Sequence, residues 1–89
     1  MGSYIVSFTE QAELDLKHWQ TANPKIVAKI ENLILDVLEH PGSGIGKPEP
    51  LRHQLSGCWS RRINHSDRMV YSVDEENKKI IIYQLRYHY

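Results

Sequence analysis

The sequence predicts an α+β fold in which an N-terminal strand and a two-helix hairpin pack on an antiparallel sheet. Three observations predict this class. Residues 10–40 carry apolar side chains at helical spacing, residues 59–88 contain runs rich in β-branched and aromatic residues, and turn-forming residues separate those runs. Since the chain has 89 residues, 40% of them hydrophobic, we expect a single domain spanning residues 1–89.

The chain opens with a strand that leads into a helix. Residues 4–8 (YIVSF) are a short β-branched and aromatic run, typical of a strand. Ser7 and Glu10 have the spacing of a capping box, and Thr9 is a competing N-cap. One apolar face then continues to about residue 21, formed by Ala12, Leu16 and Trp19. We expect Trp19 to be a core residue.

A second helix follows at once. Asn23 and Pro24 form a cap followed by a first-turn proline. An apolar stripe then extends to residues 40–42 (HPG), which stop the helix. Because the join between the helices is short, we expect them to form an antiparallel hairpin.

The second half of the chain predicts a loop and a three-stranded meander. Residues 41–50 are rich in glycine and proline and form a loop that carries Glu49. Residues 59–64, 68–73 and 79–88 are strand-like, and polar turns separate them. The isoleucines at 80–82 suggest that the last strand is covered on both faces.

Charge and composition exclude several classes of protein. No apolar run approaches the roughly 20 residues of a membrane span, so we expect no membrane association. The single cysteine excludes a disulfide framework and suits the cytoplasm. The formal net charge is zero, but residues 47–89 contain eight Lys or Arg and five Asp or Glu. This half could therefore carry a local phosphate-binding surface.

Motifs for nucleotides and metals are absent. Pro41 stands where a Walker loop needs its first glycine, and Pro48 follows Gly46 and Lys47. The five histidines lack metal-ligand spacing, and one cysteine builds no zinc site. We therefore expect neither a metal nor another cofactor, and we expect Cys58 to be structural.

Two titratable residues suit acid–base chemistry. Glu49 lies between Pro48 and Pro50, which hold the backbone extended and could aim its carboxylate. His88, next to the end of the chain, titrates near neutrality and could donate or accept a proton. A solvated acid in a stiff loop and an exposed terminal histidine are the alternatives that the residues leave open.

Arginines and tyrosines of the second half suit RNA. We expect Arg61, Arg62, Arg68 and Arg86 to lie on strands, where alternation places Arg61 and Arg62 on opposite faces. One of these two must then lean toward the core or a cleft, although a surface position is favoured for each arginine taken alone. Together with Tyr87 and Tyr89, the set fits phosphate contacts and stacked bases.

Five motifs resemble those of one known family. They are residues 46–51 (GKPEPL), 55–57 (LSG), 59–63 (WSRRI), 68–71 (RMVY) and 86–89 (RYHY). These motifs strongly resemble the YoeB/Txe family of toxins from type II toxin–antitoxin modules, within the RelE superfamily. The resemblance covers nearly the whole chain. It implies a bacterial ribosome-dependent mRNA endoribonuclease with a compact microbial-RNase-like fold.

The resemblance also implies roles for particular residues. Glu49 looks like the general base, His88 like the general acid, and Arg68 like the arginine that stabilises charge on the phosphate. The residues implied to bind substrate are Lys47, Arg52, Arg62 and Tyr89. Arg52 stands where the family commonly has lysine, which keeps the charge. Cys58 replaces a usual aromatic residue, which concerns packing rather than the catalytic set.

The partners implied by the resemblance are a cognate YefM/Axe-like antitoxin, the 70S ribosome and mRNA, and a homodimer is left open. The implied reaction is metal-independent and gives a 2′,3′-cyclic or 3′-phosphate and a 5′-hydroxyl. Two alternatives remain. One is a catalytically inactive toxin-fold protein that acts as an antitoxin-binding partner or co-repressor, and the other is an RNA-binding module without cleavage.

Overall fold

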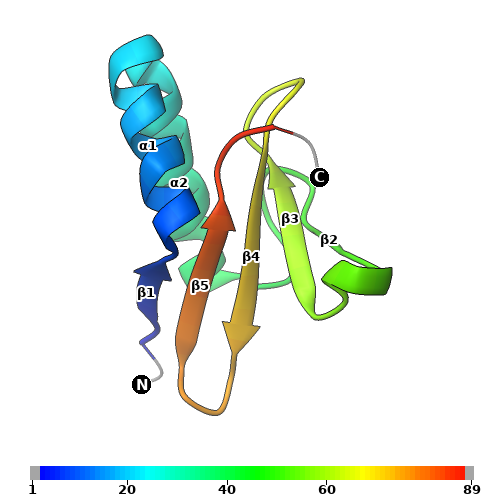
Figure 1. Cartoon of the computed structure of the whole chain (residues 1–89). Helices are drawn as coiled ribbons and strands as arrows, with labels where there is room; N and C mark the ends of the chain where they lie inside the picture. The colour runs from blue at the N-terminus through cyan, green and yellow to red at the C-terminus, as the bar shows by residue number, and fades with distance from the viewer. Residues whose placement is uncertain (1–2, 88–89) are drawn as a thin grey trace.

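The computed structural model describes residues 3–87, which form two helices on one face of a five-stranded sheet (Figure 1). The elements are β1 Ile5–Phe8, α1 Glu10–Ala22, α2 Pro24–Glu39, β2 Glu49–Pro50, a 3₁₀ turn η1 His53–Leu55, β3 Cys58–Arg62, β4 Arg68–Asp74 and β5 Lys79–Gln84. The predicted α+β class and the helical hairpin are confirmed. Neither helix of this part of the chain is long and apolar enough to cross a membrane.

Local sequence signals set the helix boundaries. The Thr9 hydroxyl accepts a hydrogen bond from the Ala12 N–H at 3.2 Å, so Thr9, rather than Ser7, is the N-cap of α1. Pro24 stands in the first turn of α2, as predicted. α2 ends at Glu39, and the next N–H, that of His40, still donates to the Asp36 carbonyl at 2.7 Å.

The sheet has the order β1-β5-β4-β3-β2. β3, β4 and β5 form the predicted antiparallel meander. β1, however, pairs in parallel with β5, so the sheet is mixed rather than wholly antiparallel. The helical hairpin separates β1 from the meander, and therefore no hairpin turn constrains its direction.

The core lies between the helices and the sheet. Its buried residues include Trp19, Ile30, Leu33, Val37, Met69, Tyr71, Ile80, Ile82 and Leu85. Trp19 is therefore a core residue, as predicted. Ile80 and Ile82 are fully buried and Ile81 is half-buried, so β5 is covered more on its helix-facing side than on the other.

Two predicted boundaries are wrong. Glu49 does not lie in a loop but in the two-residue edge strand β2, where the missing N–H of Pro50 is tolerated. The last strand ends at Gln84 rather than at residue 88, because α1 takes over the hydrogen bonds of Leu85. The Leu85 N–H donates to the Asp15 carboxylate at 2.9 Å, and the Trp19 indole donates to the Leu85 carbonyl at 2.8 Å. Arg86 consequently follows the strand instead of lying on it.

Candidate active site

Strand register gathers an acid and two arginines on one face of the sheet. Glu49 on β2 is paired with Ser60 on β3, and Arg62 on β3 is paired with Arg68 on β4. Residues directly opposite each other share a face, and so do residues two apart on one strand. Glu49, Arg62 and Arg68 therefore project from the face opposite the one that carries Arg61 and the helices.

The two arginines form a concentration of positive charge. The ion pairs among residues 3–87 are Arg61–Asp36 and Lys78–Glu75, so no described carboxylate neutralises Arg62 or Arg68. Nη1 of Arg68 donates to the carbonyls of Asn64 and Asp67, both at 3.2 Å. Like charges placed directly opposite each other destabilise a sheet. Guanidinium groups bind phosphate and carboxylate well, so anion binding is the chemistry that this pair can perform.

Tyr87 is held beside Arg68. The Arg68 N–H donates to the Tyr87 carbonyl at 3.0 Å, and the Tyr87 N–H donates to Asp67 Oδ1 at 2.6 Å. The Arg86 guanidinium lies over the exposed Tyr87 ring, 4.5 Å from its centroid. Tyr87 adopts a left-handed backbone with φ of 67°, which turns the chain at this point. Tyr87, the last described residue, therefore lies beside Arg68.

His88 and Tyr89 lie outside the described residues. Their predicted roles as general acid and as substrate-binding residue stay predictions. Of the remaining site residues, Lys47 is exposed and immediately follows Gly46, whose carbonyl accepts from the Arg62 N–H at 2.7 Å. Lys47 thus lies two residues before Glu49 in the chain and directly after a residue that is hydrogen-bonded to Arg62.

A hollow of about 510 Å³ adjoins Glu49. It is lined by Glu49, Pro50, Leu51, Arg52, His53 and Leu55. The structure thus brings Glu49 and Arg52 to one concave surface that combines apolar walls with a cation. His53 has a left-handed φ of 59° and was not singled out by the sequence, since backbone conformation leaves no signal in residue type here.

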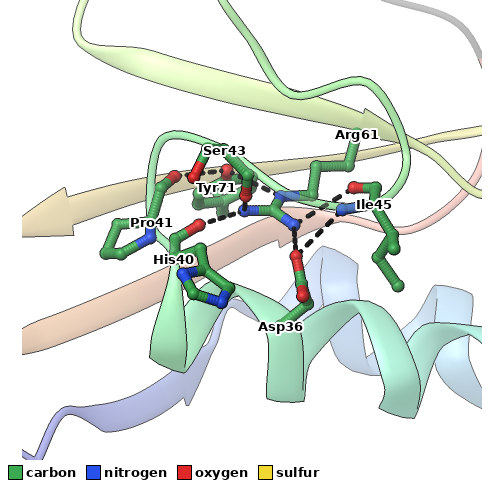
Figure 2. A network of polar contacts seen from close by, with 7 residues as sticks. All are labelled: Asp36, His40, Pro41, Ser43, Ile45, Arg61 and Tyr71. Carbon is green, nitrogen blue, oxygen red and sulfur yellow. Dashed lines mark hydrogen bonds and ion pairs between the residues drawn. The ribbon is translucent and has the colours of Figure 1, made fainter.

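Arg61 is buried at the opposite face of β3, with 0% exposure, so the surface position favoured for each arginine taken alone is wrong for this residue. Figure 2 shows its guanidinium enclosed by the loop after α2. Nε donates to the Tyr71 hydroxyl at 3.0 Å, and Nη1 donates to Asp36 Oδ2 at 2.5 Å and to the Ile45 carbonyl at 3.1 Å. Nη2 donates to the carbonyls of Ser43, at 2.7 Å, and His40. We call these groups the Arg61 network.

Among the groups whose pKa values are shifted, three lie on β3 or against it: Asp36, Tyr71 and Cys58. The hydrogen bond from Arg61 holds the pKa of the Asp36 carboxyl below its ordinary value. Burial raises the pKa of the Tyr71 hydroxyl and that of the Cys58 thiol. A raised thiol pKa disfavours the reactive thiolate at neutral pH. Within the range 3–87, no three His, Cys, Asp or Glu side chains gather closely enough to hold a metal ion.

Comparison with known proteins identifies the class. A sequence profile described as a YoeB-like toxin of bacterial type II toxin–antitoxin systems matches residues 8–89. Toxin YoeB of Escherichia coli strain K12 is 45% identical over 82 residues, which cover 92% of this chain and 95% of that protein. The fold and these matches define a toxin of a type II toxin–antitoxin system.

Solved structures agree over almost the full length. The YoeB dimer from Staphylococcus aureus superimposes with a TM-score of 0.89 at 41% identity and covers 98% of this chain and 99% of its own. YoeB in the heterotetrameric YoeB–YefM complex of the same organism gives a TM-score of 0.86 at 41% identity, with coverage of 97% and 98%. The chain belongs to the YoeB-like toxin family, as its motifs indicated.

Proposed function

We propose that this toxin is a metal-independent, ribosome-dependent mRNA endoribonuclease that a cognate antitoxin inhibits. The observation that carries the proposal is the strand register, through which Glu49, Arg62 and Arg68 share one face. Tyr87 is bonded to the same Arg68. An acid, two cations and a histidine next in sequence suffice for RNA cleavage, because the ribose 2′-hydroxyl supplies the nucleophile.

In the proposed reaction, Glu49 accepts the proton of the 2′-hydroxyl, and the freed oxygen attacks the adjacent phosphorus. The bond from phosphorus to the 5′-oxygen of the next nucleotide breaks as the new bond forms. His88 donates a proton to that 5′-oxygen, which leaves as a hydroxyl. The products are a 2′,3′-cyclic phosphate, which water can open to a 3′-phosphate, and a 5′-hydroxyl.

The cations have separate proposed tasks. Arg68 stabilises the charge that develops on the phosphate oxygens, with its guanidinium already fixed by two carbonyls. Arg62, directly opposite, contacts the same or a neighbouring phosphate. Lys47, Arg52 and Tyr89 are proposed to bind the flanking nucleotides, Arg52 from the hollow next to Glu49.

The ribosome is proposed to present the substrate. A protein with zero net charge gains little nonspecific affinity for RNA, so a surface with few cations needs its mRNA to be held in place. We accordingly propose that the protein acts in the cytoplasm, on mRNA in the 70S ribosome. By similarity to the S. aureus complex and dimer, we further propose a YefM/Axe-like antitoxin as its inhibitor and a homodimer as one of its assemblies.

The test is cleavage of a defined mRNA with and without purified 70S ribosomes, followed by analysis of the new ends. We expect cleavage with ribosomes only, giving 5′-hydroxyl and 2′,3′-cyclic phosphate ends, and we expect it to survive a chelator selective for transition metals. Addition of the antitoxin encoded beside this gene should abolish the cleavage. Antitoxin binding without any cleavage would instead support an inactive co-repressor.

A further inference from the structure

We infer that Arg61 is a positioning residue for Glu49, acting through the loop of residues 40–46. This inference rests on the proposed function of Glu49 as general base. Arg61 does not face the proposed substrate, since it occupies the helix side of β3 while Glu49 and Arg62 occupy the other. Its effect on the site must therefore pass through the backbone that it holds.

The Arg61 network binds backbone carbonyls along the whole of this loop. Arg61 holds the carbonyls of His40, Ser43 and Ile45, and the Asp36 carboxylate accepts from the Ile45 N–H at 3.0 Å. The Tyr71 hydroxyl, which accepts from Arg61, donates in turn to the Pro41 carbonyl at 2.8 Å. The loop has no regular secondary structure, so these bonds replace the hydrogen bonds that a helix or sheet would supply.

The loop leads directly to the acid. Gly46 follows the network, with its carbonyl bonded to the Arg62 N–H at 2.7 Å, and Glu49 comes three residues later. Pro48 lies between Gly46 and Glu49, and its ring restricts its own φ angle. The strand that carries Glu49 has only two residues, at the edge of the sheet. The backbone position of so short a strand depends on the segment that precedes it, which is this loop.

The chemistry of the network requires arginine. A guanidinium has five N–H donors in a fixed plane, and all five are used here by one hydroxyl, one carboxylate and three carbonyls. Lysine has three donors and no fixed plane. Arg61 is also the neighbour of Arg62 in β3. Its side chain therefore links the loop that precedes Glu49 to the strand that carries Arg62, the arginine proposed to contact phosphate.

The test is a double-mutant cycle in single-turnover cleavage on programmed ribosomes. Tyr71→Phe removes one hydroxyl from the network, and Tyr83→Phe, which removes an exposed hydroxyl that contacts Ser72, is the matched control. A misplacement of 1 Å can cost about 10²-fold in rate. We expect Tyr71→Phe to lower the maximal single-turnover rate by roughly 10- to 100-fold with little change in the half-saturating ribosome concentration, and Tyr83→Phe to leave the rate unchanged.

The decisive arm repeats Tyr71→Phe in a Glu49→Ala background, at a temperature where melts show every variant folded. If the network acts through Glu49, the second substitution causes no further loss. An equal loss in both backgrounds, or a normal rate for Tyr71→Phe alone, overturns the inference while Glu49 remains the base. A normal rate for Glu49→Ala overturns both proposals. Should Tyr71→Phe not fold, Asp36→Asn takes its place, with Asp74→Asn as control.

Discussion

Arg62 and Arg68 are paired across neighbouring strands, and neither has an ion pair with a described carboxylate. Natural sheets more often place opposite charges in such positions. The arrangement is understandable if the two guanidinium groups receive a phosphate, because the anion then neutralises both. Function and stability should therefore respond in opposite directions when one of these charges is removed.

We predict that Arg62→Gln stabilises the free protein by roughly 0.2–1 kcal/mol while it lowers ribosome-dependent cleavage by about 10²-fold. Urea unfolding and single-turnover rates measure the two effects. Arg62→Lys, which keeps the charge, is the control and should retain most of the activity. Arg62→Gln protein that is both less stable and fully active would show that this charge serves the fold only.

Asp36 gives the fold a predictable dependence on pH. Its pKa is lowered in the folded state by the Arg61 hydrogen bond, whereas the unfolded value is about 3.9. The group therefore contributes stability that is fully present above the unfolded value and is lost as pH falls through the folded one. We predict that the stability gap between wild type and Asp36→Asn narrows below about pH 4. Urea midpoints from pH 7 to acid measure it, and a constant gap would contradict the assignment.

At the scale of elements, α1 holds Leu85 and so determines where β5 ends. Asp15, buried with 4% exposure, receives the Leu85 N–H and also the Gln11 side-chain amide at 2.8 Å. Trp19, one turn later, holds the Leu85 carbonyl from the same helix. These bonds stop β5 and direct the chain toward Arg68. Helix α1 thus places residues 85–87, which immediately precede His88 in the sequence.

We predict that Asp15→Ala loosens residues 85–87 more than the rest of the fold. The change leaves the buried Leu85 N–H unpaired, which typically costs about 1–3 kcal/mol. Hydrogen exchange should speed up at Leu85 and Tyr87 while the interior amides of β4 keep their protection, and cleavage should fall. Glu13→Ala, an exposed change on the same helix, should alter neither. Unchanged exchange at Leu85 would mean that the bonds of Trp19 to Leu85 and of Asp67 and Arg68 to Tyr87 hold the segment without Asp15.

At the scale of the whole molecule, local signals predicted the elements, and long-range contacts decided the rest. The helices and the meander could be predicted because their signals, Thr9, Pro24 and the polar turns, lie within a few residues of the boundaries that they set. The burial of Arg61 could not, because its carboxylate partner is 25 residues away. The same holds for the early end of β5, which depends on Asp15, 70 residues distant from Leu85.

The candidate site likewise has some features that the sequence predicted and others that depend on long-range contacts. The residue types of Glu49 and Arg68 pointed to acid–base and phosphate chemistry, and the family motifs gave them roles. That Glu49, Arg62 and Arg68 share one face follows from strand register, which the positions of β2 and β4 determine. Of the residues behind them, Asp36 lies in none of the five motifs, and Tyr71 lies in the motif of residues 68–71 without a role implied for it.

The central claim is that Glu49, Arg68 and His88 act together to cleave mRNA. Single-turnover cleavage on programmed ribosomes tests it most directly, with thermal melts of each variant beside the rates. We predict folded proteins whose rates fall by about 10²–10⁴-fold for Glu49→Gln and His88→Ala and by about 10²–10³-fold for Arg68→Ala. A folded Glu49→Gln or His88→Ala protein that cleaves at the wild-type rate would contradict the account.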